Sequence, residues 1–346
     1  MGAAAGGIVG GNGMNRALVT GGGGFLGKAI VTMLRARGVE VRSLSRGAYP
    51  ELEAMGVEHV SASLSDGKAV RRAADGCDIV FHVGAKAGVW GPYLEYHEAN
   101  VSGTQRVLDA CKARGVQKLV YTSTPSVTFA GEDQEGVDES APYPASFLTP
   151  YPETKANAER MVLEANGEAL QTVALRPHLI WGPGDNHLVP RLIDRAKKGR
   201  LRLVNGGHGL VDSVYIDNAA EAHLNAADAL GPGAACAGKA YFITNGEPMA
   251  MGDLINGILN AAGLPPCTKN ISGGMAYFAG ATLEKIYGLL GKTDEPPMTR
   301  FVARQLATAH WFDISAARRD LGYEPRVTIA EGLERLAAHL RGETAR

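Results

Sequence analysis

Short apolar runs alternate along the chain with longer segments in which apolar residues recur every three or four positions. The apolar runs at 17–20, 39–45, 78–84, 118–124 and 172–180 predict buried strands. The periodic segments predict helices up to about residue 38, over 66–74, over 96–114 and from about residue 150. Strands that alternate with helices indicate an α/β fold, a doubly wound parallel sheet with right-handed crossovers.

Beyond Trp181 this rhythm changes, and glycine and proline separate shorter elements. We expect residues 14–180 to form the main domain, with returns to it at about 212–230 and 240–244, and residues 181–211 and 245–346 to form a smaller region. Residues 1–13 are almost all glycine and alanine and are expected to be a flexible tail rather than a secretory signal.

A glycine-rich stretch, TGGGGFLG, lies between the first predicted strand and the first predicted helix. Gly21, Gly24 and Gly27 have the spacing of a dinucleotide-binding fingerprint, and Gly22 and Gly23 are interpreted as permissive positions between them. In such a loop the three glycines allow a tight turn, a close backbone approach to pyrophosphate and helix–strand packing. The main domain is therefore predicted to bind a dinucleotide, and the smaller region to bind the substrate.

The end of the second predicted strand indicates which dinucleotide is bound. A carboxylate there would suit the ribose hydroxyls of NAD, but the chain has Ser45 and Arg46. A hydroxyl and an arginine suit a 2′-phosphate, so NADP(H) is the predicted cofactor.

A tyrosine and a lysine in YPETK provide the candidate chemistry. Tyr151 and Lys155 would lie one helical turn apart, and an ammonium beside a phenol would lower the pKa of the tyrosine toward the working pH. The preceding strand ends in hydroxyls, including Ser123 and Thr124, which can hydrogen-bond a substrate carbonyl. Tyr143 is an internal comparison, because Phe147 stands where a lysine partner would be.

Taken in order, TGGGGFLG, NVSGT, YTSTPSV, YPETK and RPHLIWGPGD resemble the motifs of the extended short-chain dehydrogenase/reductases, over nearly everything from Met14 onward. The resemblance implies that Tyr151, Lys155 and Thr124 are catalytic, with Ser123 as the alternative hydroxyl. It leaves a contact from Ser63 in doubt, because many relatives carry an aspartate there. The resemblance implies cofactor contacts from the three glycines and from Ser45, Arg46, Tyr151 and Lys155. It also implies contacts from Phe25, Leu26, Ser63, Leu64, Gly84, Ala85, Lys86, Asn100, Pro177 and Leu179.

Within that family the chain most resembles the 3β-hydroxysteroid dehydrogenase-like branch, through segments such as AKAGVWG, LVPRL and EPPMTRFVA. These segments resemble enzymes of long-chain olefin biosynthesis, which implies NADPH-dependent reduction of a 2-alkyl-3-oxoalkanoic acid to the 3-hydroxy acid. The resemblance also implies a homo-oligomer and contacts with the pathway's thiolase, ligase and β-lactone-processing enzyme.

Three alternatives remain open: a 3β-hydroxysteroid or sterol dehydrogenase, a nucleotide-sugar epimerase or dehydratase, and a non-catalytic NADP sensor. Related sugar-nucleotide enzymes commonly carry an arginine six residues before the aspartate that corresponds to Asp217, where this chain has Val211. The loss of a diphosphate partner argues against a sugar nucleotide. Sensors of this fold typically lose the tyrosine–lysine pair, which this chain keeps.

Residues 274–291 place Met275, Phe278, Leu283, Ile286 and Leu290 at helical spacing, a face that would line an alkyl pocket, touch a membrane surface or pack internally. A keto acid also needs a basic partner for its carboxylate, and the candidates are Lys86, His187, Arg191 and Arg300.

The remaining composition adds few constraints. Lys and Arg number 35 against 36 Asp and Glu, a balance without the footprint of nucleic-acid binding. Four scattered cysteines predict free thiols in the cytoplasm, neither a disulfide framework nor a zinc site. The acidic segment 132–139 is expected to be a solvated loop, and no metal is predicted. No apolar run is long enough to span a membrane, so membrane contact would be peripheral.

Overall fold

A computed structural model describes residues 14–343, and the predicted tail at residues 1–13 lies outside this range. Its centre is a seven-stranded sheet in the order β12-β7-β5-β4-β1-β2-β3, in which every neighbouring pair is parallel. The strands are β1 (Arg16–Thr20), β2 (Glu40–Ser45), β3 (Glu58–Ser61), β4 (Ile79–His82), β5 (Lys118–Thr122), β7 (Gln171–Pro177) and β12 (Lys239–Ile243). The predicted α/β fold with a doubly wound parallel sheet is confirmed.

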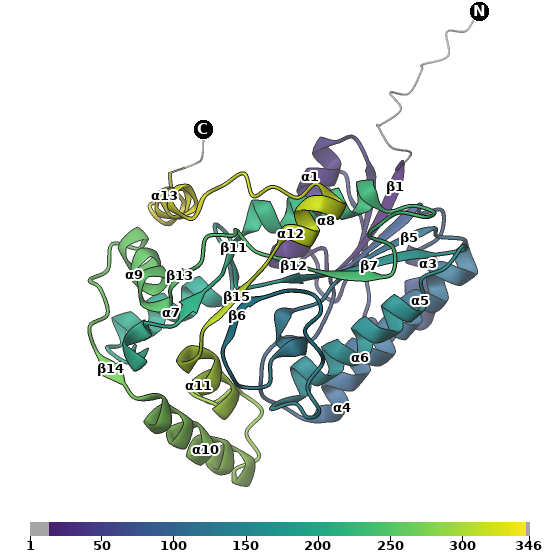
Figure 1. Ribbon diagram of the computed structural model, residues 1–346. Coiled ribbons are helices and arrows are strands. Elements are labelled where there is room, and N and C mark those ends of the chain that lie inside the picture. Colours follow the sequence, from purple (N-terminus) through teal and green to yellow (C-terminus); the bar gives the residue numbers. More distant parts are fainter. Residues whose placement is uncertain (1–13, 344–346) are drawn as a thin grey trace, which may run out of the picture.

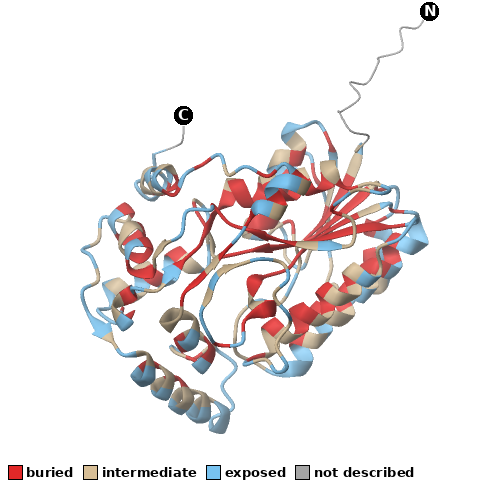
Figure 2. Ribbon diagram, in the orientation of Figure 1, coloured by how far each residue is buried: buried red, intermediate tan, exposed pale blue. Residues whose placement is uncertain are grey.

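Helices cover both faces of this sheet (Figure 1). One face carries α1 (Phe25–Ala36), α8 (Ile216–Ala229) and α12 (Ser315–Leu321), and the other carries α3 (Gly67–Ala73), α5 (Gly103–Arg114) and α6 (Pro150–Glu164). The central strands are mostly apolar because both faces are covered, and Figure 2 shows them buried. The short α2 (Pro50–Ala54) links β2 to β3.

The helix predicted over 96–114 differs from the observed one. It begins as α4 (Tyr93–Tyr96), continues as a π-helical turn at His97–Ser102, and only then becomes the α-helix α5. π-Helical turns are rare and often occur at functional sites. Asn100 lies inside this turn and is 2% exposed, so the irregular backbone positions a buried polar side chain.

The smaller region lies beside the carboxyl ends of the large sheet (Figure 1). Its four-stranded sheet has the order β13-β10-β15-β6 and contains β10 (Leu210–Val211), β13 (Met249–Ala250) and β15 (His310–Phe312). The fourth strand, β6 (Gln134–Val137), comes from the segment predicted to belong to the main domain. Two further pairs are β8 (Ile180–Trp181) with β11 (Val214–Tyr215) and β9 (Leu203–Val204) with β14 (Asn270–Ile271). The surrounding helices are α7 (Leu188–Lys197), α9 (Met251–Ala261), α10 (Gly273–Leu289), α11 (Arg300–Ala307) and α13 (Ile329–Leu340).

The acidic segment 132–139 is not the solvated loop expected from the sequence. Residues 134–137 form β6, which pairs with β15. The flanking carboxylates accept backbone hydrogen bonds, Asp133 from Ala309 N at 2.8 Å and Glu139 from Phe242 N at 2.9 Å. Asp133 therefore holds the segment before β15 of the second sheet, and Glu139 bonds to β12 of the large sheet.

Helix α10 exposes most of the apolar face that the sequence predicts. Phe278 is 75% exposed, Met275 and Leu290 are 64% exposed, and the helix packs instead through Ala276 and Gly280, both buried. A Cβ at Gly280 would lie 2.6 Å from the backbone of Thr299. The absence of a side chain at Gly280 therefore lets the segment before α11 approach α10 closely. The internal-packing alternative for this face is therefore wrong.

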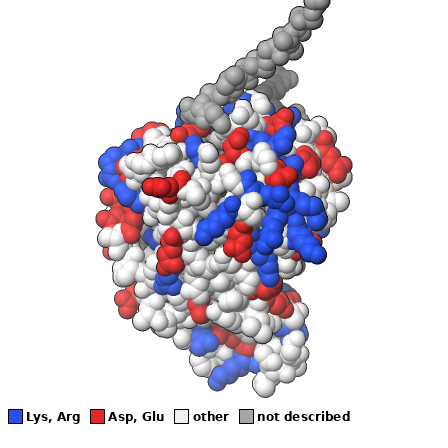
Figure 3. All heavy atoms as spheres, turned by 90° about the vertical axis from the view of Figure 1, so that its right-hand side faces the viewer, with Lys and Arg blue, Asp and Glu red and all other residues white. Residues whose placement is uncertain are grey.

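Acidic and basic side chains are interspersed on the surface, although Lys and Arg gather over part of one face (Figure 3). Several arginines form ion pairs at 2.8 Å or closer, including Arg42 with Glu58 and Arg16 with Glu40. Within residues 14–343, no helix has the length and apolar character needed to cross a membrane.

Candidate active site

The glycine loop forms a tight turn between β1 and α1. Gly21 has φ +70°, and a Cβ there would lie 2.8 Å from Gly84 Cα, so only glycine fits both the backbone conformation and the contact. A Cβ at Gly27 would lie 2.1 Å from the Gly21 carbonyl oxygen. The predicted positions therefore meet the backbone approaches that a dinucleotide loop requires.

The interpretation of Gly22 and Gly23 as permissive positions is wrong. A Cβ at Gly22 would lie 2.4 Å from Ser43 Oγ, and one at Gly23 would lie 2.2 Å from Cζ of Tyr49. The Tyr49 ring lies directly against the loop and packs edge-on to His59, with ring centroids 5.4 Å apart. Gly21, Gly22 and Gly23 are thus closely surrounded, which no spacing rule for the motif indicates for Gly22 and Gly23.

The N-terminus of α1 has the features of an anion site. Gly24 is the N-cap and provides no side-chain cap, and the first turn, with Phe25 and Leu26, has no acidic residue. The first backbone N–H groups of a helix and its dipole favour a negative group at this end. These residues fit the pyrophosphate of a dinucleotide.

Ser45 and Arg46 lie beside this loop. Ser45 Oγ accepts a hydrogen bond from Gly23 N at 3.1 Å, which leaves its own hydroxyl hydrogen available. The Arg46 side chain is exposed, and its carbonyl accepts from Ser61 Oγ at 3.2 Å. The structure therefore places the Ser45 hydroxyl on the glycine loop and Arg46, with an exposed side chain, directly after Ser45.

The ends of β3 and β4 provide the next group of predicted residues. Ser63 Oγ is used locally, as the acceptor for Ser65 N at 3.2 Å. The Leu64 side chain lies close to Gly84 and Gly103, since a Cβ on either glycine would approach it to 3.4 Å or less. Ala85 is exposed after Gly84.

Asn100 joins the segment after β4 to helix α6. Its Oδ1 accepts from Lys86 N at 2.7 Å, and its Nδ2 donates to Lys86 O at 3.1 Å and to Thr154 Oγ1 at 3.0 Å. Thr154 lies between Tyr151 and Lys155, so one amide holds the Lys86 backbone against the candidate catalytic turn. The Lys86 ammonium pairs with Glu95 at 2.6 Å and lies 5.2 Å from the centroid of the Tyr96 ring.

Tyr151 and Thr124 meet at the start of α6. Desolvation raises the pKa of Tyr151 to about 12, and a hydrogen bond with Thr124 opposes this rise. Thr124 is 9% exposed and caps a 3₁₀ turn at Pro125–Thr128, where its Oγ1 accepts from Ser126 N at 3.3 Å. Ser123 Oγ is also buried and makes no hydrogen bond to the described residues. Thr124 is therefore the strand-end residue that lowers the pKa of Tyr151, and its Oγ1 also donates to Ser126 Oγ at 3.2 Å.

The burial of Lys155 changes the pKa values expected for the tyrosine–lysine pair. It is 3% exposed, and its ammonium donates to Thr122 O at 2.5 Å and lies 4.1 Å from the centroid of the Tyr121 ring. Burial lowers the pKa of Lys155 to about 7. The pKa of Tyr151 is raised here rather than lowered, because desolvation outweighs the hydrogen bond with Thr124.

The segment after β7 carries a strained residue. Pro177 ends β7 and is buried, and Leu179 has φ +43°, one of two non-glycine residues with positive φ in the described chain. Left-handed backbone at a non-glycine residue costs about 1–2 kcal/mol and often occurs at functional sites.

Two buried histidines near the site do not appear among the sequence predictions. His223 Nε2 lies 2.8 Å from Thr122 Oγ1, on the residue whose carbonyl accepts from Lys155. His82 lies between Thr20 Oγ1 and Thr104 Oγ1, at 2.7 and 2.9 Å. A histidine that ends an otherwise apolar strand, as in DIVFHVG, is the sequence signal for the second one.

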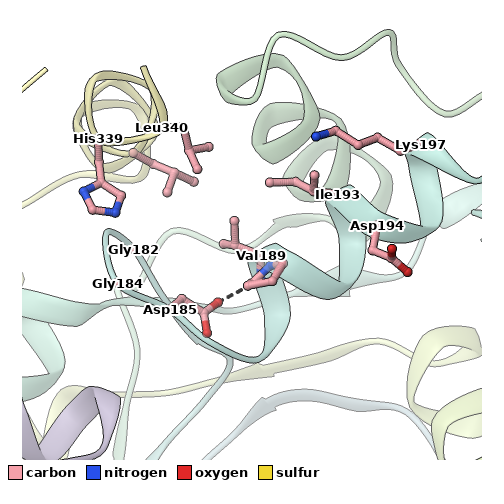
Figure 4. A pocket seen from close by; sticks show the side chains of 11 residues that line it. Gly182, Gly184, Asp185, Val189, Ile193, Asp194, Lys197, His339 and Leu340 are labelled. Atoms are coloured by element: carbon pink, nitrogen blue, oxygen red, sulfur yellow. Dashed lines mark hydrogen bonds between the residues drawn. The ribbon is translucent and has the colours of Figure 1, made fainter. Parts of the chain in front are cut away.

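A cavity of about 390 Å³ lies elsewhere, between the loop after β8, α7 and α13 (Figure 4). Asp185 caps α7 there by accepting from Val189 N at 2.8 Å, and His339 and Leu340 close the opposite side. None of the candidate catalytic residues lines this cavity.

Comparisons with known proteins agree with this geometry. A profile of the 3-beta hydroxysteroid dehydrogenase/isomerase family matches residues 18–270. The chain is 56% identical to 2-alkyl-3-oxoalkanoate reductase of Stenotrophomonas maltophilia (strain K279a), over 93% of this chain and 98% of that protein. It is 53% identical to 2-alkyl-3-oxoalkanoate reductase of Shewanella oneidensis (strain MR-1), over 94% and 87%.

Among solved structures, MoeE5 in complex with UDP-glucuronic acid and NAD has a TM-score of 0.73 and 25% identity, over 95% of this chain and 99% of that one. Matched structures of this fold therefore include a complex with a nicotinamide dinucleotide, in accord with the glycine loop described above. The fold, the profile match and the identity to these reductases lead to one conclusion: the chain belongs to the 3-beta hydroxysteroid dehydrogenase/isomerase family of extended short-chain dehydrogenase/reductases.

Proposed function

We propose that this protein is an NADPH-dependent reductase that converts a 2-alkyl-3-oxoalkanoic acid to the 2-alkyl-3-hydroxyalkanoic acid in long-chain olefin biosynthesis. The observation that carries the proposal is the position of Tyr151 one helical turn before the buried Lys155, in a turn that Asn100 holds through Thr154. The effect of Thr124 on the pKa of Tyr151 agrees with this arrangement. The names of the two relatives support the choice of substrate.

The chain's own residues provide binding and proton transfer. When bound, the reduced coenzyme supplies a hydride to C3 of the substrate. Thr124 holds the ketone oxygen, and the Tyr151 hydroxyl donates the proton that this oxygen takes up. Lys155 lies one turn away, where its positive charge stabilises the phenolate that Tyr151 becomes.

The choice of NADP(H) rests on Ser45 and Arg46. Both lie at the edge of the glycine loop, where the 2′-phosphate of a dinucleotide would need a cation and a hydroxyl. Arg46→Glu should lower kcat/KM with NADPH by at least about tenfold relative to NADH, the loss of one charge-assisted contact. An unchanged ratio of the two kcat/KM values would contradict the role of Arg46.

Of the four basic residues considered for the carboxylate, Lys86 has the most suitable position. The carboxylate of a 3-keto acid is two carbons from the ketone, so its partner must lie close to Tyr151. Asn100 fixes the Lys86 backbone beside the catalytic turn, whereas Arg191 lies on α7 and Arg300 at the start of α11. All three side chains form ion pairs, Lys86 with Glu95, Arg191 with Glu295 and Arg300 with Glu284. His187 lies just before α7.

We expect Lys86→Met to reduce kcat/KM for the acid more than for the matching ketone without a carboxylate, by about tenfold. Lys198→Met is a control at an exposed lysine that also pairs with a carboxylate, Asp194 at 2.7 Å. Equal effects on the acid and the ketone would remove Lys86 from this role.

One assay tests both the direction of the reaction and the chemical class of the substrate. NADPH absorbance at 340 nm is followed with a 2-alkyl-3-oxoalkanoic acid, a 3-ketosteroid and a UDP-sugar. Consumption with the keto acid alone is the expected result. Consumption with the steroid alone would favour the second candidate, a 3β-hydroxysteroid dehydrogenase, which the family profile supports. Coenzyme binding without turnover on any ketone would indicate a sensor.

The exposed face of α10 supports contact with a lipid surface, from which long-chain substrates would be drawn. Leu289 is 87% exposed, and Lys285 and Lys292 are exposed on the same helix end, where Trp90 donates to Lys292 O at 3.1 Å. Apolar residues flanked by lysine and aromatic side chains are typical of interfacial helices. Phe278→Asp combined with Leu289→Asp should abolish sedimentation with anionic vesicles, and unchanged sedimentation would contradict this contact.

A cytoplasmic location, a homo-oligomer and contacts with the pathway's thiolase, ligase and β-lactone-processing enzyme are proposed on the resemblance to the olefin pathway alone. Co-purification with these enzymes and light scattering test the contacts and the oligomer.

A further inference from the structure

A chain of buried hydrogen bonds runs from the glycine loop to the catalytic helix. Gly84 N donates to Thr20 Oγ1 at 3.1 Å, and Thr20 Oγ1 lies 2.7 Å from His82 Nδ1. His82 Nε2 lies 2.9 Å from Thr104 Oγ1, which donates to Asn100 O at 2.6 Å. The side chains of these residues are all 2% exposed or less, apart from the backbone donor Gly84.

The acceptors in this series of hydrogen bonds determine which atom donates and which accepts in each of them. Asn100 O can only accept, so the single hydroxyl hydrogen of Thr104 is used there, and Thr104 must accept from His82 Nε2–H. His82 Nδ1 then carries the lone pair and accepts from the Thr20 hydroxyl. Burial lowers the pKa of His82 to about 3, and the nearby Lys155 charge acts in the same direction, so the imidazole remains neutral at working pH.

The two ends of the chain belong to different halves of the dinucleotide site. Thr20 directly precedes Gly21, whose turn lies against Gly84. Asn100 holds the Lys86 backbone and reaches Thr154, between Tyr151 and Lys155. The His82 imidazole is therefore the central link between the glycine loop and the turn of α6 that carries Tyr151 and Lys155.

We propose that His82 is a positioning residue that fixes the distance between the glycine loop and the first turn of α6, which Asn100 contacts through Thr154. The two parts of the protein that hold one dinucleotide thereby keep a constant separation. The loss of His82 leaves the buried Thr20 hydroxyl without an acceptor and Thr104 Oγ1 without a donor, although Thr20 still accepts from Gly84 N and Thr104 still donates to Asn100 O. Each unsatisfied buried group is costly, which loosens the two loops relative to each other. The inference rests on the proposed reductase only for its turnover readout.

The first test compares two substitutions of His82. His82→Leu removes both hydrogen bonds, whereas His82→Gln keeps one acceptor and one donor on a side chain of similar reach. Coenzyme affinity is measured by quenching of protein fluorescence with NADPH, and kcat by absorbance at 340 nm, each corrected for the folded fraction. His82→Leu should raise the Kd about tenfold and lower kcat, and His82→Gln should recover most of both.

Asn218→Leu is the control for a purely structural effect. Asn218 is 1% exposed and donates to Asn245 Oδ1 at 2.9 Å and to Val327 O at 2.7 Å, none of which is a site residue. It should lower stability and leave the corrected Kd unchanged. If His82→Leu behaves like Asn218→Leu, or if His82→Gln recovers nothing, the positioning role is wrong.

A second test does not require His82→Leu to fold. Thr20→Val and Thr104→Val remove the two partners of His82 separately, and the double variant removes both. If the imidazole links the loops, either single substitution already breaks the link. The double variant should therefore raise the Kd by less than the product of the two single effects. Multiplicative effects would overturn the inference. Because the Kd is measured without substrate, it reports on His82 even if no keto acid is reduced and the proposed function fails.

Discussion

The buried ammonium of Lys155 should make the stability of the protein depend on pH in a defined way. Its pKa is lowered from 10.5 to about 7, so between these values the unfolded chain binds a proton that the folded chain does not. Stability therefore rises with pH through this window and is constant, with respect to this group, below pH about 7. The residue is 3% exposed, so solvent screening is small.

The size of the effect follows from the shift. A difference of roughly 3.5 pKa units corresponds to about 5 kcal/mol over the full window, and the part between pH 7 and pH 9.5 to about 3 kcal/mol. Lys155→Met, which has no charge, should lack this contribution. Relative to the wild type it should be more stable at pH 7, and the advantage should decrease by about 3 kcal/mol at pH 9.5.

The assay is urea unfolding without coenzyme at several pH values, in which other titrating groups cancel between the two proteins. Lys198→Met is the control for the loss of a lysine at an exposed position. A difference between Lys155→Met and the wild type that stays constant from pH 7 to pH 9.5 would refute the reasoning.

Two further predictions concern the loop and the core. Gly27→Ala places a Cβ 2.1 Å from the Gly21 carbonyl oxygen, so coenzyme titration should show a Kd raised by at least about tenfold, and a Kd within twofold of the wild type would contradict the predicted clash. Glu159→Gln leaves Arg176 uncompensated in an ion pair of 2.6 Å that is almost fully buried, which should lower the free energy of unfolding by about 3–5 kcal/mol in urea. Glu58→Gln, which removes an exposed carboxylate that pairs with Arg42, should change it by less than about 1 kcal/mol, and equal losses for the two variants would contradict this argument.

The sheet and the catalytic turn could be predicted from the sequence because both depend on local patterns. Strands buried on both faces read as apolar runs, and Tyr151 and Lys155 are separated by one helical turn within a single segment. The glycine spacing is also local, since it is set by one strand–turn–helix unit.

Features that depend on distant segments could not be predicted in this way. Gly23 is enclosed by Tyr49, from the segment after β2, and the hydrogen bonds of His82 join β1 to α5. The acidic segment 132–139 forms a strand only because β15 pairs with it from far along the chain. The pKa of Tyr151 follows from burial, which the YxxxK spacing does not report.

The most direct test of the account is the role of the Tyr151 hydroxyl. Tyr151→Phe keeps the ring and removes the proton donor, and Tyr277→Phe is the control, at a ring that packs against Arg304 outside the site. With a 2-alkyl-3-oxoalkanoic acid and NADPH, we predict that Tyr151→Phe lowers kcat at least about 100-fold and leaves the coenzyme Kd within about twofold of the wild type. A kcat for Tyr151→Phe close to that of Tyr277→Phe and the wild type would contradict the central claim.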